Sequence, residues 1–437
     1  MSETRLADRI RNGSARVTVI GQGYVGLPLA VELARAGFSA TGLDTDFDRV
    51  AKLNAGQSYT PDVDSKALGA LIAAGRYEAT TDAAVLEQSD VVIICVPTPL
   101  RKSKDPDISY VVAAAEEVAR RFRPEQLVIL ESTTYPGTTE ELLLPMFEAR
   151  GARVGVDFFL AFSPERIDPA NGKFSLAEIP KIVGGVTPEC SRMAALLYGE
   201  IIDKVLEVSS PKIAELAKLY ENTFRNVNIA LANEFALMGR RLGVNIREVI
   251  EAAATKPFGF MPFYPGPGIG GHCIGIDPFY LAWKMRLNGY EFRFIHLADE
   301  INRAMPAYVV ELVTEALNER KRCLNGADIL ILGVAYKRGV SDMRESPALE
   351  IIATLQDKGA NVSYTDPHVP SLVLEHGQTL KAVELTKQRL AAADCVVIVT
   401  DHVDFDYRKI VDTAQLVVDT RNATWGLDVP RERVVTL

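Results

Sequence analysis

The chain has 437 residues, 48% of them hydrophobic and 24% charged, so its composition supports two or three domains with large cores. Its formal net charge of −9 argues against non-specific nucleic-acid binding but allows small anionic ligands, which local amides and single cations can hold. The absence of a long apolar run argues against a membrane protein. Because residues 1–21 also lack the apolar core of a signal peptide, we expect a cytoplasmic location.

The N-terminal third alternates strand and helix signals. Short apolar runs bounded by turn residues predict strands, and the stretch LPLAVELARAG predicts a helix that ends at Gly37. The predicted strands cover residues 17–21, 39–44, 90–97 and 127–132. Buried strands separated by helices indicate a parallel sheet that is covered on both faces.

A glycine-rich turn joins the first predicted strand to the first helix. Gly21, Gly23 and Gly26, with Tyr24 and Val25 between them, match Gly-x-Gly-x-x-Gly. The first glycine permits a tight turn, the second lets the backbone approach a pyrophosphate, and the third allows close helix–strand packing. This pattern predicts a dinucleotide site in which the helix N-terminus binds phosphates.

The cofactor is expected to be NAD. Asp44 ends the next strand at the separation typical of the acid that binds a ribose diol, and its charge would repel the 2′-phosphate of NADP. Pro97-Thr98 and Thr133 follow later strands, at the sheet edge where ligands bind in such folds. The alternative is an ordinary glycine turn with a solvated aspartate.

A second α/β segment occupies the C-terminal part of the chain. Strands are predicted at 327–336, 361–366, 393–401 and 415–420, with a helix that starts near Ser346. Residues 212–243 lack proline and carry apolar residues at helical spacing, so they predict a long helix that joins the two α/β parts and stops at Gly243. We therefore expect domains at 1–205, 206–315 and 316–437.

The five cysteines differ in their surroundings. Cys273 lies in the glycine-rich segment PGPGIGGHC, which favours a loop that lies close against a ligand. Cys95 and Cys395 lie in apolar strand runs, and Cys190 and Cys323 lie among polar residues. An odd number of cysteines without a CxxC pair fits a reducing compartment, and no cysteine–histidine cluster suggests a metal. Cys273 is therefore the candidate nucleophile.

Residues that could assist Cys273 have ordinary explanations as well. Lys218 and Asn222 are four residues apart and share a helix face, where a cation could favour a thiolate, but such a pair is commonly a solvated face. His272 is expected to be structural. Asp277, before Pro278, could be catalytic or a turn residue.

Seven segments together resemble the UDP-glucose/GDP-mannose dehydrogenase family over nearly the whole chain. They are VIGQGYVGLPLA, CVPTPL, ESTTYPGTT, FSPERIDP, AKLYENTFRNVNIALANE, PGPGIGGHCIGIDP and GVAYKRGVSDMRESPAL. The resemblance implies an α/β fold with two Rossmann-like doubly wound domains. The N-terminal domain would bind NAD, the C-terminal domain would bind the UDP moiety, and the long central helix would support dimerisation.

The resemblance also implies roles for individual residues. The implied catalytic set comprises a nucleophile, two groups that stabilise an oxyanion and three that position water or act as base: Cys273; Lys218 and Asn222; Thr133, Asp277 and Glu165. The implied substrate-binding set is Glu165, Arg166, Lys218, Asn222, Tyr264, Gly266, Gly268, Gly270, Lys337 and Arg344.

These residues suit a four-electron oxidation of a primary alcohol to a carboxylate with two molecules of NAD. Addition of a cysteine to the intermediate aldehyde would give a thiohemiacetal, whose oxidation gives a thioester that water hydrolyses. The forms FSPERIDP and PGPGIGGHCIGIDPFYL resemble the bacterial N-acetylhexosamine branch, so the expected substrate is UDP-N-acetyl-D-glucosamine, in surface-polysaccharide synthesis.

Other interpretations stay open. UDP-GalNAc, UDP-ManNAc or UDP-glucose could be the substrate instead. A β-hydroxyacid-type dehydrogenase shares the glycine motif and a Lys/Asn helix but performs one oxidation without a cysteine. A non-catalytic nucleotide-sugar sensor would keep only the fold. We expect a homodimer or a higher homo-oligomer, with no membrane, nucleic-acid or metal partner.

Overall fold

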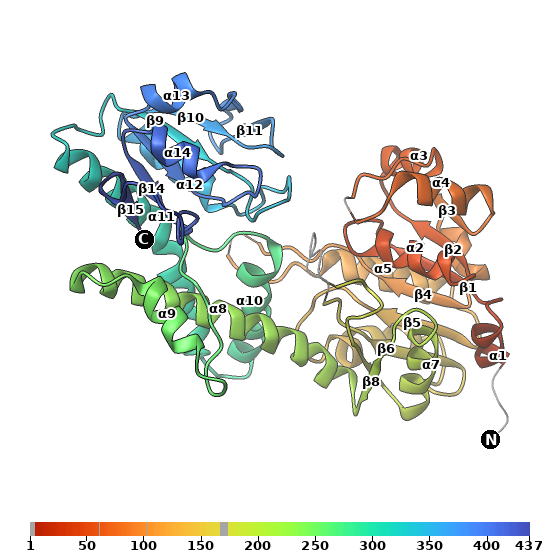
Figure 1. Ribbon diagram of the computed structural model, residues 1–437. Coiled ribbons are helices and arrows are strands. Elements are labelled where there is room, and N and C mark those ends of the chain that lie inside the picture. Colours follow the sequence, from red (N-terminus) through yellow and green to blue (C-terminus); the bar gives the residue numbers. More distant parts are fainter. Residues whose placement is uncertain (1–4, 61, 102, 167–173) are drawn as a thin grey trace. The chain divides into compact units, whose positions relative to one another are not determined.

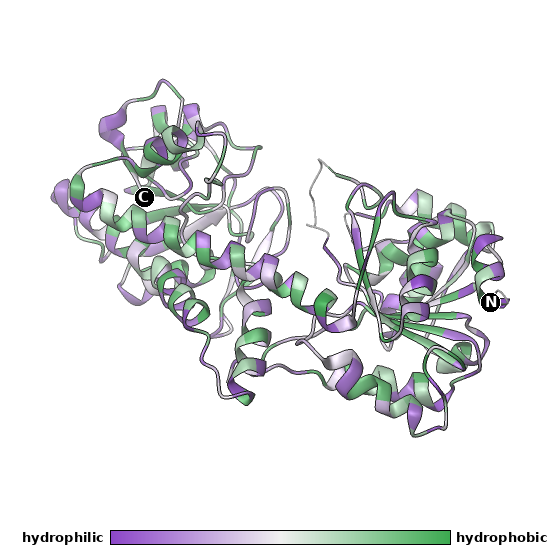
Figure 2. Ribbon diagram, turned by 90° about the horizontal axis from the view of Figure 1, so that it is seen from below, coloured by the Kyte–Doolittle hydropathy of each residue, from purple (hydrophilic) through white to green (hydrophobic). Residues whose placement is uncertain are grey.

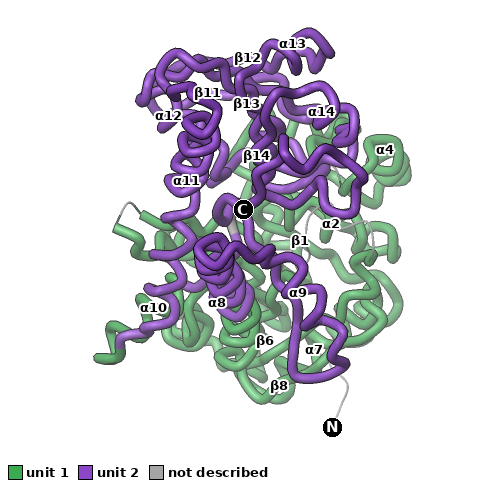
Figure 3. Tube along the Cα trace, turned by 60° about the vertical axis from the view of Figure 1, so that its left-hand side comes forward, with its two compact units in different colours: residues 1–221, 279–290 green, residues 222–278, 291–437 purple. Residues whose placement is uncertain are grey.

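A computed structural model describes residues 5–60, 62–101, 103–166 and 174–437. The end of the FSPERIDP segment, Ile167–Pro169, lies outside the described residues, and so does the side chain of His272, for which a structural role is expected. The chain divides into two compact units, residues 1–221 with 279–290 and residues 222–278 with 291–437 (Figure 3).

The first unit is built on an eight-stranded sheet of order β3-β2-β1-β4-β5-β6-β7-β8 (Figure 1). All neighbours are parallel except β6 and β7. The strands are β1 (Arg16–Ile20), β2 (Ser39–Leu43), β3 (Tyr77–Thr80), β4 (Val91–Ile94), β5 (Gln126–Leu130), β6 (Phe158–Phe162), β7 (Lys181–Gly185) and β8 (Val205–Val208). The order 3-2-1-4-5-6 is that of a dinucleotide-binding Rossmann sheet.

Helices cover both faces of this sheet. Val91 and Ile93 of β4 belong to one core with α2 and α7, whereas Val92 and Ile94 belong to a second core with α5 and α6. This alternation follows from the period of two along a strand. The helices and short turns are α1 (Arg5–Arg11), α2 (Gly26–Arg35), α3 (Phe47–Asn54), α4 (Ser65–Ala73), η1 (Ala83–Gln88), α5 (Ser109–Arg120), η2 (Thr139–Leu143), α6 (Leu144–Glu148) and α7 (Pro188–Tyr198).

The second unit carries a five-stranded parallel sheet of order β10-β9-β13-β14-β15. Its strands are β9 (Asp328–Leu332), β10 (Asn361–Thr365), β13 (Cys395–Ile398), β14 (Val417–Asp419) and β15 (Val434–Thr436), with a small hairpin of β11 (Ser371–Val373) and β12 (Thr379–Lys381). Ile329 and Ile331 face α11 and α12, while Leu330 and Leu332 face α13 and α14. The sheet is therefore doubly wound as well. In Figure 2 the helices alternate between hydrophilic and hydrophobic residues, as expected where one face of a helix packs against a core.

Long helices complete the chain. α8 (Pro211–Leu242) begins in the first unit and ends in the second, where Gly243 follows it with φ of +68°. The others are α9 (Ile246–Ala254), α10 (His272–Leu287), α11 (Arg293–Glu319), α12 (Pro347–Asp357), α13 (Lys387–Ala392), α14 (Tyr407–Thr413) and the turn η3 (Arg431–Arg433). The structure confirms two doubly wound sheets and a long helix, and no described helix is long and apolar enough to cross a membrane.

Three features differ from the sequence-based expectations. The strands β3, β6, β7 and β8 of the first unit, and β11, β12 and β15 of the second, were not predicted. Cys190 is fully buried in the core of the first unit, because α7 turns its thiol inward to accept a hydrogen bond from Leu160 N at 3.3 Å, so its polar neighbours in sequence were misleading. Cys273 and Asp277 lie inside α10 rather than in a loop and a turn.

Candidate active site

The glycine turn between β1 and α2 has the shape that a dinucleotide needs. Gly21 has φ of +89°, and a Cβ there would lie 2.6 Å from the carbonyl oxygen of Cys95. A Cβ on Gly26 would lie 1.9 Å from the carbonyl oxygen of Gly21, so the helix packs against the turn only because residue 26 is glycine. A Cβ on Gly23 would meet nothing within 4 Å, which leaves its backbone open to a ligand.

The start of α2 suits an anion. Its N-cap residue, Val25, provides no side-chain hydrogen bond, so no side chain of the cap occupies the first-turn amides. Tyr24 is exposed beside it. The unneutralised positive end of the helix dipole and the open surface at Gly23 fit the pyrophosphate of a dinucleotide.

Asp44 is held in place at the end of β2. Its Oδ2 accepts hydrogen bonds from Gln22 N at 2.7 Å and from the Arg49 guanidinium at 2.9 Å, and its Oδ1 accepts one from Asp46 N at 3.0 Å. The carboxylate is therefore anchored directly beside the glycine turn, where a dinucleotide ribose would lie.

Three further residues expected at the cofactor lie at the ends of β4 and β5. Pro97 is exposed, and Thr98 is buried with its carbonyl accepting a hydrogen bond from Tyr280 Oη at 3.0 Å. Thr133 Oγ1 accepts a hydrogen bond from Lys218 Nζ at 2.5 Å. The structure thus brings together Thr133 and Lys218, two residues of the expected catalytic set.

Glu165 lies in a buried ionic cluster of the first unit. Its Oε2 is 3.1 Å from Lys181 Nζ, and Lys181 is also 2.9 Å from Glu131 Oε1. Burial raises the pKa of Glu131, and Lys181 offsets part of that effect. Burial acts to lower the pKa of Lys181, but the two carboxylates outweigh it and raise that pKa above its ordinary value.

Arg166 follows Glu165 but points elsewhere. Its guanidinium forms two hydrogen bonds with the Glu221 carboxylate, at 2.7 and 3.1 Å, and one with the carbonyl of Pro180 at 2.7 Å. Its amide donates to Glu165 Oε1 at 2.7 Å. In this arrangement the expected substrate-binding arginine also fixes the position of Glu165 through its backbone.

In the second unit, the N-terminal part of α10 carries Cys273 and Asp277. Cys273 is exposed at the second position of the helix, and Asp277 lies four residues later on the same face. Asp277 is fully buried, and its Oδ2 accepts a hydrogen bond from Asn222 Nδ2 at 2.7 Å. The structure therefore joins Asn222 and Asp277, and it places the exposed Cys273 thiol at the N-terminal end of a helix.

Asn226 supplies a hydrogen bond that Pro278 cannot make within this helix. A proline in a helix cannot donate to the carbonyl four residues earlier, which here belongs to Ile274. The Ile274 carbonyl instead accepts a hydrogen bond from Asn226 Nδ2 at 2.9 Å. Asn222 and Asn226, one turn apart on α8, thus both support the segment that carries Cys273.

The glycines before Cys273 pack closely against other parts of the second unit. A Cβ on Gly266 would lie 2.8 Å from the Arg421 guanidinium, and one on Gly270 or Gly271 would lie 2.7 Å from Tyr336. Gly268 has φ of +127°, which other residues rarely adopt. The amide of Gly266 donates to Asn233 Oδ1 at 2.9 Å. Tight packing within the protein is thus one reason for the glycines.

The remaining expected substrate residues lie around this loop or on the elements next to it. Gly271 N donates to the carbonyl of Arg344 at 3.0 Å, which ties the loop to the Arg344 segment. The Arg344 side chain pairs with Asp342 at 2.6 Å, Lys337 Nζ lies 5.8 Å from the Tyr336 ring centre, and the Tyr264 ring contacts the Arg247 guanidinium.

The sequence reasoning missed Lys181, Arg421 and Asn226. A lysine or arginine in a sequence gives no sign that distant carboxylates or a glycine loop will surround it. Asn226 had a usable signal, since Pro278 in a helix requires a donor for the carbonyl four residues earlier.

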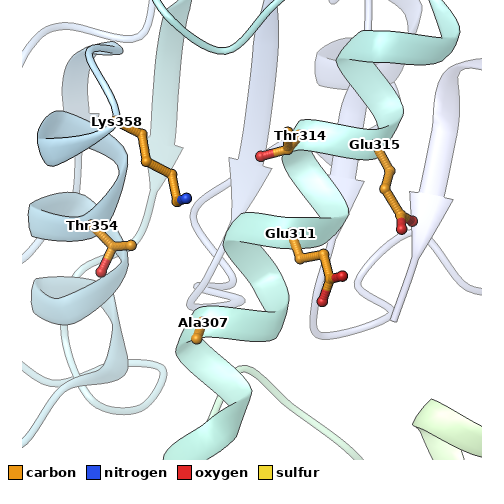
Figure 4. Close-up of a pocket in the computed structure, with 6 residues that line it drawn as sticks. All are labelled: Ala307, Glu311, Thr314, Glu315, Thr354 and Lys358. Atoms are coloured by element: carbon orange, nitrogen blue, oxygen red, sulfur yellow. The ribbon is translucent and has the colours of Figure 1, made fainter.

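Two other features of the second unit take no part in this set. His368, His402 and Asp404 bring potential metal-binding atoms within 4.8 Å of one another. Both ring nitrogens of His402 are engaged, however, because Nδ1 accepts from Gly339 N at 3.2 Å and Nε2 faces Asp366 at 3.1 Å. A groove between α11 and α12, lined by Glu311, Glu315 and Lys358 among others, contains none of the expected site residues (Figure 4).

Three family models match successive parts of the chain. They describe the UDP-glucose/GDP-mannose dehydrogenase family and cover its NAD binding domain at residues 15–202, its central domain at 212–304 and its UDP binding domain at 330–425.

Curated relatives and solved structures agree with these matches. UDP-N-acetyl-D-glucosamine 6-dehydrogenase of Pseudomonas aeruginosa is 37% identical over 89% of this chain and 91% of the relative. UDP-N-acetyl-D-mannosamine dehydrogenase of Pyrococcus horikoshii is 38% identical over 89% and 90%. A solved structure of UDP-D-ManNAc dehydrogenase from Pyrococcus horikoshii has a TM-score of 0.86 at 34% identity, covering 96% of this chain and 98% of that one. The chain therefore belongs to the UDP-glucose/GDP-mannose dehydrogenase family and is an NAD-dependent nucleotide-sugar dehydrogenase.

Proposed function

We propose that the protein oxidises the C6 alcohol of UDP-N-acetyl-D-glucosamine to the carboxylate, in surface-polysaccharide synthesis, with Cys273 as covalent nucleophile. The observation that carries the proposal is the environment of Cys273. Its thiol is exposed at the N-terminus of α10, four residues before the buried Asp277–Asn222 pair. An exposed thiol beside a positive helix end is suited to attack a carbonyl.

NAD, bound twice in succession, would accept the hydride of each oxidation. In the first oxidation, the substrate hydroxyl gives up its proton to Lys218 or to a water that Asp277 holds, and an aldehyde forms. Thr133, whose Oγ1 lies 2.5 Å from Lys218 Nζ, would orient the Lys218 side chain.

The second oxidation needs a covalent step, because an aldehyde has no hydride to release until a nucleophile adds. The Cys273 sulfur adds to the carbonyl carbon, and the negative charge that develops on oxygen would be stabilised by Lys218 and Asn222. Loss of one such donor typically costs about 3–4 kcal/mol of barrier. Hydride loss then gives a thioester, which water hydrolyses with Glu165 or Asp277 as base.

The remaining residues of the expected substrate-binding set would contact the nucleotide sugar. The glycine loop (Gly266, Gly268 and Gly270), with Tyr264, Lys337 and Arg344, would hold the nucleotide and its phosphates, and Arg166 would assist from the segment after β6. The UDP binding family model at residues 330–425 supports a UDP-sugar.

The choice of sugar is the finer part of the proposal. Relatives named for N-acetylglucosamine and N-acetylmannosamine have similar identity, 37% and 38%, so UDP-ManNAc, UDP-GalNAc and UDP-glucose are the competing substrates. NADH release from each UDP-sugar under equal conditions tests this. We expect the highest kcat/KM with UDP-N-acetyl-D-glucosamine, and a higher value for another sugar would refute that choice.

A stoichiometry experiment separates the proposal from a single-step dehydrogenase. We expect two NADH per substrate and a uronic acid product. C273S should lose acid formation while NAD binding persists, with C323S, an exposed cysteine elsewhere, as the matched control. Acid formation by C273S at the wild-type rate would refute the covalent scheme.

We also propose a cytoplasmic homodimer. Apolar side chains along α8 are exposed at intervals of three, four and seven residues, which would suit a helix-based interface between two copies. They are Ile213, Leu216, Tyr220, Phe224, Leu231, Phe235, Met238 and Leu242. Light scattering of the purified protein should give twice the mass of one chain.

A further inference from the structure

Lys181 is a buried cation at the edge of the first sheet where ligands bind. Glu131 follows β5, and Glu165 follows β6, so both lie at the carboxyl ends of parallel strands. Because β7 runs antiparallel to β6, its first residue, Lys181, reaches the same edge. Topology alone thus brings the three charges together.

The three groups form a defined chain of contacts. Lys181 Nζ lies 2.9 Å from Glu131 Oε1 and 3.1 Å from Glu165 Oε2, and the exposed fractions of the three side chains are 5%, 0% and 8%. Tyr198 Oη donates a hydrogen bond to the same Glu131 oxygen, and the Lys181 ammonium lies 5.1 Å from the Tyr198 ring centre. Glu131 and Tyr198 therefore contact Lys181 in addition to Glu165.

Glu165 is in turn fixed at both oxygens. Oε1 accepts the Arg166 amide at 2.7 Å, and Oε2 accepts Lys181 Nζ. Stability alone does not account for so many buried charges, because the cost of removing them from water offsets most of their attraction. Two carboxylates facing one ammonium also leave a net charge of −1 on the trio, which makes the ionisation of Glu165 sensitive to its neighbours.

We propose that Lys181 is a positioning residue that keeps Glu165 ionised and correctly oriented as the base for thioester hydrolysis. The inference rests on the base role proposed above for Glu165. In that step the water oxygen bonds to the acyl carbon, the C–S bond breaks with its electron pair going to the Cys273 sulfur, and a water proton goes to Glu165.

The charged and titratable groups around Glu165 come from five elements or their ends. They are Cys95 after β4, Glu131 after β5, Arg166 after β6, Lys181 of β7 and Tyr198 of α7. Burial raises the pKa of Cys95 and of Tyr198, so both stay neutral near pH 7. The charged side chains among these are therefore Lys181, Glu131 and Arg166, and the Arg166 guanidinium is paired with Glu221.

Single-turnover hydrolysis of the Cys273 thioester, followed by rapid quench and mass spectrometry across pH, tests the role. In K181M we expect the acidic limb of the hydrolysis profile to move to higher pH by about one to three units, because a cation within hydrogen-bond distance is lost. Thioester formation should change much less. K181R, which keeps the charge, should restore the wild-type limb.

Two variants at Glu131 keep the test informative if K181M folds poorly. The double variant K181M/E131Q has the same formal charge on the trio as the wild type, so its acidic limb should return toward the wild-type position. E131Q alone removes a competing carboxylate, so its limb should move to lower pH or stay in place. A limb that moves to higher pH in E131Q would contradict the inference.

Other outcomes also overturn it. If folded K181M, checked by thermal melting and NAD binding, hydrolyses the thioester with an unshifted limb, Lys181 is structural only. Equal slowing of thioester formation and hydrolysis, without a pH shift, leads to the same conclusion. Absence of any Cys273 adduct in the wild type would instead refute the proposed function itself, so the two failures are distinguishable.

Discussion

Asp44 and Arg49 show how one ion pair can serve cofactor choice. The Asp44 carboxylate would bind a ribose diol, and it also neutralises Arg49 at 2.9 Å. An arginine near this position is the group that accepts the 2′-phosphate of NADP in other dinucleotide folds. Asp44 is therefore expected to favour NAD over NADP in two ways. It would bind the ribose diol, and it keeps the Arg49 guanidinium paired.

Replacement of Asp44 tests both effects. In D44A we expect NAD to bind about ten- to hundredfold more weakly, because hydrogen bonds to a charged acceptor are lost. NADP should bind more tightly than to the wild type, because Arg49 is released. In D44A/R49A that gain for NADP should disappear. Titration calorimetry with both cofactors measures this, and unchanged affinities in D44A would remove Asp44 from the ribose site.

At the scale of single residues, local patterns in the sequence provide candidates only for chemistry that depends on neighbours in the chain. The glycine turn, Asp44 and Cys273 belong to continuous segments whose spacing reflects their geometry. Lys181 is different, because its burial depends on Glu131, 50 positions earlier, and on Glu165. Nothing in the segment IPKIVGG distinguishes this lysine from a solvated one.

At the scale of elements, hydrophobic periodicity predicted α2, α8 and α12 and left most of the other described helices unassigned. The predicted helix at 212–243 is α8 at Pro211–Leu242, and the helix predicted from Ser346 is α12, whose N-cap is Ser346. The strands β7 and β8 escaped prediction for physical reasons. β7 begins with a lysine and ends with two glycines, and the side chains of β8 are largely exposed, so neither forms an apolar run.

The support of α10 by α8 leads to a stability prediction. N226A removes the donor to the Ile274 carbonyl, which Pro278 cannot satisfy, so we expect a loss of about 1–3 kcal/mol. N228A is the matched control, because Asn228 is only half-buried and donates to the Phe224 carbonyl of its own helix. Its effect should stay below about 0.5 kcal/mol. Urea unfolding measures both, and equal losses would contradict the assigned role of Asn226.

At the scale of the whole molecule, both sheets have a glycine after their first strand and an aspartate that binds the following amide. The roles that we infer for the two aspartates differ. In the first, Gly21 follows β1 and the amide after it binds Asp44. In the second, Gly333 follows β9, has φ of +79°, and the amide after it binds Asp366 at 2.7 Å. The sequence already showed a weak echo of strand, loop, helix and strand ending in aspartate. It did not show that the second aspartate is closed off from a ligand.

Both carboxylate oxygens of Asp366 accept hydrogen bonds from residues of the same unit. Besides Val334 N, its oxygens accept the amides of Ala335, His368 and Val369, and His402 lies 3.1 Å away. Burial acts to raise the pKa of Asp366, but the hydrogen bonds from His402 and the backbone outweigh it and hold that pKa below its ordinary value of 3.8. This carboxylate therefore stabilises the second sheet, whereas Asp44 is expected to bind the ribose of the cofactor.

The stabilising role of Asp366 carries a pH dependence of definite sign. Because its pKa is lowered in the folded state, its contribution is complete above about pH 4 and is lost as the pH falls through the folded value. D366N should lower the free energy of unfolding by about 2–4 kcal/mol at pH 7, and the difference from the wild type should shrink below about pH 4.

D401N is the control, because the pair of Asp401 with the exposed Arg338 should contribute less than about 1 kcal/mol. Trp425 reports on this unit once the other tryptophan, Trp283, is replaced by phenylalanine, so urea unfolding of W283F followed by fluorescence measures the effect where it arises. A D366N penalty that stays constant down to pH 3 would mean that Asp366 acts through packing and not through its charge.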